Sequence, residues 1–175
     1  MQFKWKQGLA AAAVALTVAV SANAATAATA NETIPAWASA EISAWQELGL
    51  LKGDANGSVR PNADVSRAEF AAFVNRVFNY KDESDAAFSD VPASAWYVSD
   101  IRKAVAAGAL QGSGNGTVAP LDPLTREQAA LVLYRIFHVE PAASSAKFTD
   151  DAQISSWAKE AVYAMKAEGY VEGTP

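Results

Sequence analysis

The sequence contains no cysteine, a single histidine and fewer basic than acidic residues. Without cysteine it can form no disulfide framework, no thiolate metal site and no cysteine nucleophile. One histidine is too few for a multi-histidine centre, so we expect no metal and no cofactor. The 14 Lys and Arg against 19 Asp and Glu argue against nucleic acid as a partner, because its binding depends on basic contacts to phosphate.

The sequence also lacks an apolar run of the roughly 20 residues that cross a bilayer. An uncharged run rich in Leu, Ala and Val, Gly8 to Val20, follows two lysines and precedes Ala22-Asn23-Ala24. This order of basic, apolar and small residues predicts a secretory signal peptide over residues 1–24, hence a secreted mature chain without a membrane span. Cleavage after Ala27 or Ala30, and an uncleaved anchor, are the alternatives.

What the sequence does have is an internal repeat, which decides the fold class. A tryptophan, three glycines, a proline and two arginines return 59 residues later, and part of the set returns once more. The predicted repeats cover residues 31–80, 86–140 and 146–175, the last of them incomplete. The recurring positions in the first repeat are Trp37, Gly49, Gly53, Gly57, Pro61, Arg67 and Arg76.

Each repeat is predicted to form a helix, a glycine loop and a second helix, which gives an all-α fold. The first helix ends at a glycine such as Gly49, a left-handed cap. The loop carries Asn56-Gly57 or Asn115-Gly116, a dipeptide that predicts a type I′ turn; a calcium loop is the less favoured alternative. The second helices carry wide apolar stripes, which we expect to pack against one another as a small bundle. In the first repeat the stripe is Phe70, Phe73, Val74, Val77 and Phe78.

The second helices also carry strong start signals. Ser66 with Glu69, and Thr125 with Gln128, have the spacing of capping boxes. Arginine follows each cap, at Arg67 and Arg126, where the helix dipole mildly disfavours a cation. One explanation is an anion that meets the guanidinium group and the helix N–H groups together. The alternative is an ion pair with a carboxylate of the next repeat, such as Asp90 or Asp150.

Trp37, Trp96 and Trp157 begin the first helices near these arginines. A repeated tryptophan is more often a core residue than a ligand platform. An indole ring can nevertheless stack on a sugar while its N–H holds a hydroxyl group. Arginine and tryptophan at one rim together favour an acidic glycan as the ligand.

These motifs resemble the S-layer homology family. The matching residues are Phe88-Ser89-Asp90-Val91-Pro92, Trp96, Gly112 to Gly116, Pro120, and Leu124-Thr125-Arg126-Glu127-Gln128-Ala129. Val65-Ser66-Arg67-Ala68-Glu69-Phe70 is similar to the family's signature, and the resemblance extends from about Pro35 to Pro175. It implies a pseudo-threefold bundle with prongs that binds an anionic, often pyruvylated, secondary cell wall polymer attached to peptidoglycan. In this resemblance Arg67 and Arg126 meet the acidic substituent, Glu69 and Gln128 support them, and Asp90 and Asp150 shape the grooves.

The sequence departs from the family pattern in three places. The second repeat reads Thr125-Arg126-Glu127-Gln128, so the fourth residue of its signature is neutral. The first repeat has Thr29 and Asn31 where the second has Phe88 and Asp90. The signature arginine of the third repeat would fall at position 187, because 126 + 61 = 187, beyond Pro175. The predicted consequences are a truncated product, recruitment of a second copy, or lower stability.

The sequence therefore predicts a non-catalytic module that attaches noncovalently to the cell wall at the cell surface. One alternative is a cell-surface assembly protein that self-associates through an uncovered face. The other is a glycan-active enzyme using Asp150-Asp151 as a carboxylate pair, although adjacent acids at a helix entrance are more often a cap.

Overall fold

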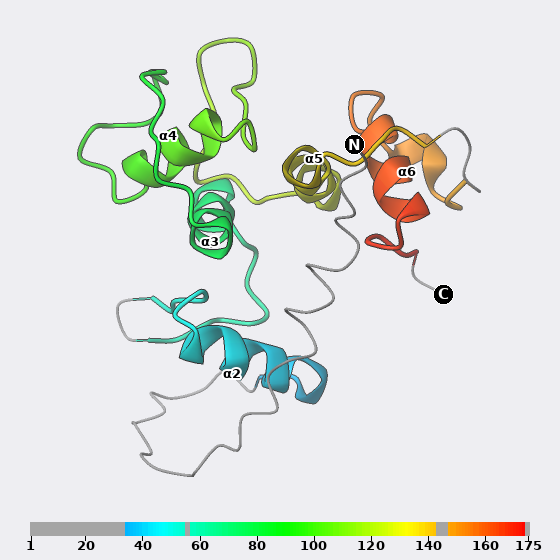
Figure 1. The fold of residues 1–175 in the computed structure, drawn as a ribbon, viewed down its shortest axis with the longest axis horizontal. Coiled ribbons are helices and arrows are strands. Elements are labelled where there is room, and N and C mark those ends of the chain that lie inside the picture. Colours follow the sequence, from blue (N-terminus) through cyan, green and yellow to red (C-terminus); the bar gives the residue numbers. More distant parts are fainter. Residues whose placement is uncertain (1–33, 55–56, 143–146, 174–175) are drawn as a thin grey trace, which may run out of the picture. The chain divides into compact units, whose positions relative to one another are not determined.

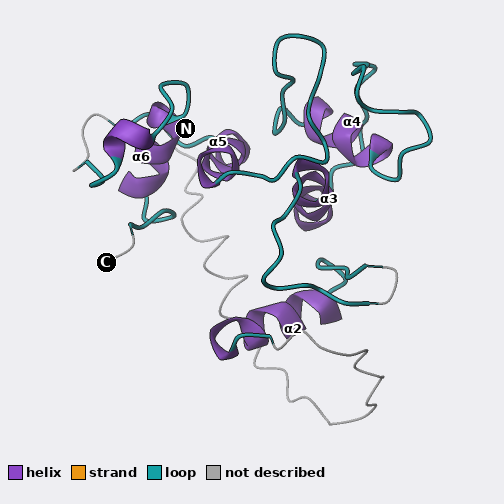
Figure 2. Cartoon of the chain, turned by 180° about the vertical axis from the view of Figure 1, so that it is seen from behind, coloured by secondary structure: helices purple, strands orange, loops and turns teal. Residues whose placement is uncertain are grey.

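The computed structural model describes residues 34–54, 57–142 and 147–173, and within these ranges it is helical. The predicted signal peptide and its cleavage sites lie outside the described residues. The α-helices are α2 (Ser39–Glu47), α3 (Arg67–Phe78), α4 (Val98–Ala106), α5 (Arg126–Phe137) and α6 (Lys159–Ala167), with short 3-10 helices at Ala36–Ala38 and Asp151–Gln153 (Figure 1). In the described ranges the only β pairing is an isolated antiparallel bridge between Ser66 and Pro123, so the all-α prediction is confirmed (Figure 2).

The sequence repeat is visible in the backbone. Left-handed φ angles, which most side chains avoid, occur in pairs 59 residues apart. Arg60 and Ala119 have φ of 47° and 48°, and the helix caps Asn79 and His138 have 56° and 48°. Because these four residues are not glycine, equal backbone strain at matched positions shows that the two repeats share one conformation.

Both predicted capping boxes are formed. The Ser66 side chain accepts a hydrogen bond from the Glu69 backbone N–H, and the Glu69 carboxylate accepts one from Ser66 N at 2.8 Å. Thr125 and Gln128 form the same reciprocal pair at the start of α5. Each box satisfies two backbone donors that a helix start would otherwise leave without a partner.

The helices pack in pairs that cross the repeat boundary. α3 packs against α4 of the second repeat, and α5 packs against α6 of the third. Between the two predicted apolar stripes, Phe78 of α3 and Phe137 of α5 are in contact, with ring centroids 5.9 Å apart. α3 instead buries small residues, Ala68, Ala71 and Ala72, because alanines let the two helix backbones approach closely.

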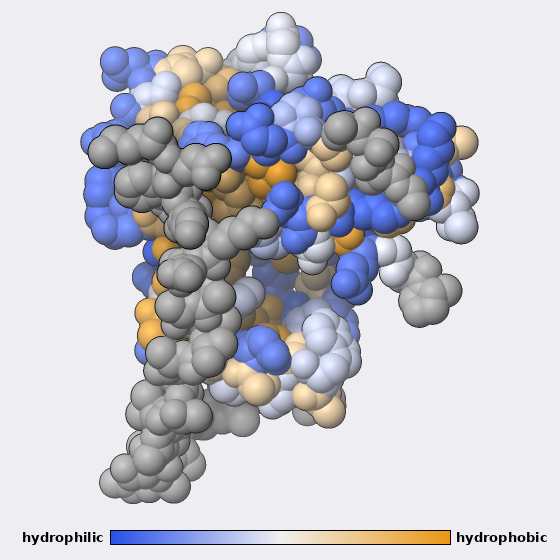
Figure 3. Space-filling model, turned by 45° about the vertical axis from the view of Figure 1, so that its right-hand side comes forward, coloured by the Kyte–Doolittle hydropathy of each residue, from blue (hydrophilic) through white to orange (hydrophobic). Residues whose placement is uncertain are grey.

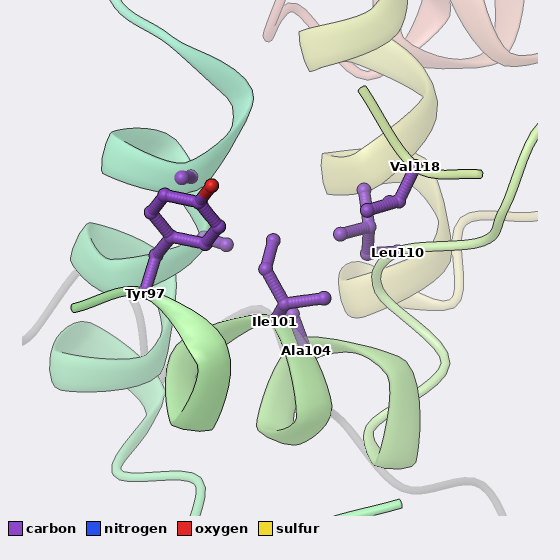
Figure 4. Packing of buried hydrophobic residues seen from close by; sticks show 7 residues of the cluster. Tyr97, Ile101, Ala104, Leu110 and Val118 are labelled. Carbon is purple, nitrogen blue, oxygen red and sulfur yellow. The ribbon is translucent and has the colours of Figure 1, made fainter. Parts of the chain in front are cut away.

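A core cluster fills the space beneath α3. Ile101 of α4 is fully buried and points between Tyr97 on one side and Leu110 and Val118 on the other (Figure 4). Val118 belongs to the loop that precedes α5, so the same core holds this loop in place. Hydrophilic residues cover most of the face seen in Figure 3, with apolar residues exposed between them.

The glycine loop of the second repeat differs from its prediction, whereas Asn56 of the first repeat lies outside the described residues. Gly116 has φ of 79°, but Asn115 has no positive φ, so Asn115-Gly116 is not a type I′ turn. The Asn115 side chain instead accepts hydrogen bonds from Thr117, and Ser113 N donates to Thr117 O at 2.8 Å. Satisfying the loop through a side chain removes the need for two left-handed residues in succession.

Candidate functional site

The start of α3 is covered by the segment Val118–Leu124 of the second repeat, which we call the docking loop. Arg67 N donates to Asp122 O at 3.1 Å, and Ala68 N donates to Pro120 O at 2.8 Å. These are backbone donors that a helix start leaves without an intrahelical partner. The expectation that an anion meets these N–H groups is therefore wrong at α3, because loop carbonyl groups already occupy them.

Arg67 itself holds the docking loop. Its Nε donates to Val118 O at 2.7 Å, and its side chain is half-buried. Burial lowers the pKa of Arg67, and the charges of Asp122 and Asp90 oppose that effect. The hollow beside Arg67 measures only about 10 Å³, far too small for a sugar. The charge of Asp90, the expected partner, acts on Arg67, but the hydrogen bond from Arg67 Nε goes to the carbonyl group of Val118.

Asp90 also binds the docking loop, through its carboxylate. Its carboxylate accepts hydrogen bonds from Val118 N at 3.1 Å and from Ala119 N at 2.7 Å. Asp90 thus accepts hydrogen bonds from two N–H groups of the docking loop, and Arg67 donates one to a carbonyl group of the same loop. Charged partners make such hydrogen bonds stronger than neutral ones.

The start of α5 carries the same sequence features without such a loop. Arg126 is exposed, and within the described residues neither Arg126 N nor Glu127 N donates a hydrogen bond. The Asp150 carboxylate, the counterpart of that of Asp90, is also exposed and accepts no hydrogen bond from the described residues, whereas the Asp150 backbone carbonyl accepts one from Gln153 N at 2.8 Å. The Glu127 carboxylate instead accepts hydrogen bonds from Ser155 N and Oγ, both at 2.9 Å.

A cleft of about 770 Å³ opens between the glycine loop of the first repeat and α3. Its apolar wall includes Trp45, Phe70 and Phe73, with the Trp45 and Phe73 ring centroids 5.0 Å apart. Trp96 and Asp100 of the second repeat complete the lining. The volume lies within the usual range for small-molecule sites, which pair an apolar lining with a few polar groups.

Three cations line this cleft, namely Lys52, Arg60 and Arg76. Arg60 Nη2 forms an ion pair with Glu69 Oε1 at 2.8 Å, and Arg76 Nε donates to Leu50 O at 2.6 Å. Burial would raise the pKa of Glu69, but the hydrogen bonds from Ser66 and the charge of Arg60 outweigh it and lower the pKa. Glu69 therefore stays ionised and keeps Arg60 oriented at the rim.

The structure brings together only part of the predicted site. Glu69 and Trp96 line the cleft, whereas Arg67 does not, and the remaining predicted residues are absent from its lining. Sequence reasoning missed Arg60 because the second repeat has Ala119 there, and a search for recurring residues discards a residue that does not recur. The remaining predicted residues are Arg126, Gln128, Trp37, Trp157, Asp90 and Asp150.

The three repeated tryptophans are exposed rather than buried. Trp37, Trp96 and Trp157 expose 82%, 62% and 51% of their surface, so their interpretation as core residues is wrong. Trp96 alone of the three lines the cleft, where its ring meets Tyr97 edge-on at 5.3 Å. An exposed indole held by a neighbouring ring has the geometry of a stacking platform.

Asp151 is bound within its own repeat. It accepts a hydrogen bond from Tyr163 Oη at 2.6 Å, and Lys159 Nζ lies 3.0 Å from its carboxylate. The hydrogen bond from Tyr163 and the contact with Lys159 lower the pKa of Asp151. A glycosidase acid needs the opposite shift, so this arrangement does not favour sugar hydrolysis.

The described ranges contain no group of three or more His, Asp or Glu side chains arranged to hold a metal ion. None of their helices combines the length and the apolar character that a bilayer crossing requires.

Comparison with known proteins places these features in a family. The S-layer homology domain model matches residues 32–71, 87–130 and 147–175, more than half of the chain. The Surface-layer 125 kDa protein of Lysinibacillus sphaericus is 32% identical over 94% of the chain and 14% of its own length. The S-layer protein sap of Bacillus anthracis is 27% identical over 79% of the chain and 17% of its own length.

Enzymes appear among the relatives, but the match covers little of them. The Amylopullulanase of Thermoanaerobacterium thermosulfurigenes is 33% identical over 84% of the chain and only 8% of its own length. The chain thus spans a small fraction of the curated relatives it matches, and the shared part is the non-catalytic domain. Family, relatives and helical repeats agree: the chain belongs to the S-layer homology family, the secreted modules that anchor S-layer and other surface proteins to the cell surface.

Proposed function

We propose that the chain anchors to the cell wall by noncovalent binding of an anionic, pyruvylated secondary polysaccharide in the cleft of the first repeat. The observation that carries this proposal is a cleft of about 770 Å³ with an aromatic wall and three cations, which lie among four acids, Asp54, Asp64, Glu69 and Asp100. Aromatic side chains stack on the apolar faces of sugar rings, and guanidinium groups bind carboxylates in a bidentate manner. The cleft therefore combines the two chemistries that an acidic glycan requires.

Within this cleft we assign the carboxylate of the sugar substituent to Arg60 and Arg76, and the sugar ring to Trp96. Arg60 is half-exposed at the rim, and Glu69 already fixes its side chain. A preoriented cation loses less conformational entropy when a ligand binds. Glu69 supports Arg60 in this scheme, whereas the resemblance implies that it supports Arg67.

The signature arginines receive different roles in this proposal from those the resemblance implies. Arg67 holds the docking loop on the start of α3, since its Nε donates to Val118 O. Asp90 supports the same loop from the other side. Replacing Arg67 would therefore disturb folding as well as binding, which makes it a poor probe of the ligand contact.

The test is a pulldown with peptidoglycan sacculi that retain their secondary polymer, compared with sacculi stripped by hydrofluoric acid. The chain should bind only the former. Arg60→Ala combined with Trp96→Ala should weaken binding at least tenfold. Arg102→Ala, which removes an exposed cation outside the cleft, is the matched control and should bind as the unaltered chain does. Unchanged binding by the double variant would refute the cleft assignment.

A further inference from the structure

Asn75 of α3 is a buried polar side chain that binds a residue of the cleft. It is only 5% exposed, and its Nδ2 donates to Asp100 O at 2.8 Å and to Asp100 Oδ1 at 3.0 Å. Both partners are acceptors, so the amide must direct its Nδ2 at them. Asn75 Oδ1 is then left buried without a partner among the described residues. Such an orphaned oxygen destabilises the fold, whereas the Nδ2 group fixes the Asp100 carboxylate.

Asp100 brings this fixed carboxylate to the cleft. It lines the cleft together with Trp96, which precedes it by four residues at the start of α4. Asn75 binds its Oδ1, whereas its Oδ2 accepts no hydrogen bond and its carboxylate forms no ion pair within the described part of the chain. One oxygen therefore holds the orientation of the carboxylate, and the other keeps its capacity for a ligand.

The other acids of the cleft have different surroundings. Glu69 closes the capping box with Ser66 and pairs with Arg60. Asp54 accepts a hydrogen bond from Ser58 N at 3.1 Å, and Asp64 is exposed. Within the described residues, Asp100 is thus the cleft acid that a buried side chain orients.

The chemistry of an ionised carboxylate decides what Asp100 can bind. A carboxylate accepts hydrogen bonds and cannot donate them, so its partner must be a donor. A sugar carries hydroxyl donors around the edge of its ring, while the face of the ring stacks on an indole. Because Trp96 and Asp100 come from one helix start and line one cleft, they can contact the face and the edge of the same sugar.

We propose that Asp100 accepts a hydrogen bond from a hydroxyl group of the sugar that stacks on Trp96, with Asn75 as the positioning residue that holds the carboxylate. This inference rests on the glycan cleft proposed above and adds a specificity-determining residue to it. Arg60 and Arg76 attract the acidic substituent, whereas Asp100 repels it. A sugar bound in the reverse orientation is therefore excluded by like charge.

A purely electrostatic role for Asp100 gives the opposite result on substitution. If Asp100 contacted no sugar, its charge would only oppose an acidic polymer, and Asp100→Ala would tighten binding. If it accepts a hydrogen bond from the sugar, Asp100→Ala should weaken binding about tenfold, since hydrogen bonds to charged groups are among the stronger ones. The sign of the change separates the two roles.

The experiment is a binding isotherm of each purified variant on sacculi that retain their secondary polymer, which gives an apparent Kd. Asp100→Ala should raise this Kd about tenfold. Asp64→Ala is the charge-matched control, because it removes an exposed acid from the same cleft, and it should lower the Kd slightly. An unchanged or lower Kd for Asp100→Ala, or an equal rise for Asp64→Ala, would overturn the proposal.

The fold should tolerate the Asp100 substitution. Asn75 Nδ2 keeps the Asp100 backbone carbonyl as a partner, so no further buried group loses its hydrogen bond. Circular dichroism should show an unaltered helical signal. Asp100→Asn, which keeps the size and one acceptor oxygen, is the second variant should Asp100→Ala unfold, and its Kd should lie between the other two.

The positioning role of Asn75 is tested by a double-mutant cycle. Asn75→Leu keeps most of the side-chain volume and should raise the Kd about threefold in the unaltered chain, as a loosened Asp100 binds less well. In the Asp100→Ala background it should raise the Kd no further. A merely structural defect would raise it equally in both backgrounds, and that result would refute the positioning role.

The same isotherms separate this inference from the proposed function. If the unaltered chain binds the sacculi and the Arg60→Ala, Trp96→Ala double variant does not, an unchanged Kd for Asp100→Ala refutes the role of Asp100 alone. If the unaltered chain fails to bind sacculi that retain their polymer, both proposals are wrong.

Discussion

The starts of α3 and α5 share a signature but differ in what covers them. Both begin with a capping box followed by arginine. At α3 the next repeat supplies a loop that occupies the backbone donors and the arginine Nε, whereas the described residues supply none at α5. Within the described residues, the same local sequence is therefore covered by a loop at α3 and not at α5. The covering depends on contacts with another repeat and not on the motif itself.

The two repeats also differ in a pair of side chains. Arg60 and Glu69 form an ion pair in the first repeat, and the corresponding residues in the second are Ala119 and Gln128. The backbone is the same at both positions, with φ of 47° at Arg60 and 48° at Ala119. One scaffold thus carries a charged rim in the first repeat and a neutral rim in the second.

The largest difference between the two starts is expected for their matched aspartates. Asp90→Ala removes an acceptor from two backbone N–H groups and should lower the free energy of unfolding by about 2–3 kcal/mol. Asp150→Ala should change it by less than about 0.5 kcal/mol, because the Asp150 side chain accepts no hydrogen bond within the described ranges. Urea unfolding at low protein concentration measures both. Equal losses would show that the two starts are not different.

A smaller difference is expected for the two caps. Ser66→Ala and Thr125→Ala should each cost about 1 kcal/mol in the free energy of unfolding, the usual cost of removing an N-cap side chain. The loss should be greater at Ser66, since its hydroxyl group also donates to the charged Glu69 carboxylate at 2.8 Å. Thermal unfolding of the two variants decides the order, and a greater loss at Thr125 would contradict it.

The smallest expected difference concerns the dependence of stability on pH in the acid range. The pKa of Glu69 is lowered in the folded chain from its ordinary value of 4.5, so its contribution to stability is present above that value. The contribution is lost as the pH falls through the lowered pKa. Glu69→Gln should therefore flatten the dependence of stability on pH below about 4.5. The change should amount to a few tenths of a kcal/mol, because the ion pair with Arg60 is partly exposed and screened by solvent.

The comparison for this prediction is Gln128→Glu. Position 119 offers no arginine, so the new carboxylate gains only the hydrogen bonds of its capping box. Its effect on acid stability should be smaller than that of Glu69. An equal effect would assign the lowered pKa of Glu69 to the box rather than to Arg60.

Local features of the fold could be predicted from the sequence because local interactions determine them. The capping boxes and the glycine at the end of each first helix depend on residues a few positions apart. The buried face of α3 could not be predicted by hydrophobicity alone. Alanines occupy it because they allow close packing against α4, and the larger phenylalanines Phe70 and Phe73 line the cleft instead.

Fewer features of the candidate site than of the fold could be predicted from the sequence. Arg67 contacts Val118, a residue 51 positions away, and no spacing rule links the two. The cleft cation Arg60 interrupts the repeat instead of following it. Trp96 could be predicted as a ligand platform from its chemistry, but its exposure depends on the packing of α4, which the sequence pattern does not specify.

The ion pair between Arg60 and Glu69 constrains how such repeats diverge. Changing only Arg60 leaves a lone carboxylate beside the serine cap, and changing only Glu69 leaves an unpaired guanidinium at the cleft rim. The path from the first repeat's pair to the alanine and glutamine of the second thus passes through an intermediate with an uncompensated charge. Among related chains these two positions should covary. Exchanging both residues together between the two repeats should transfer the ion pair from the first repeat to the second.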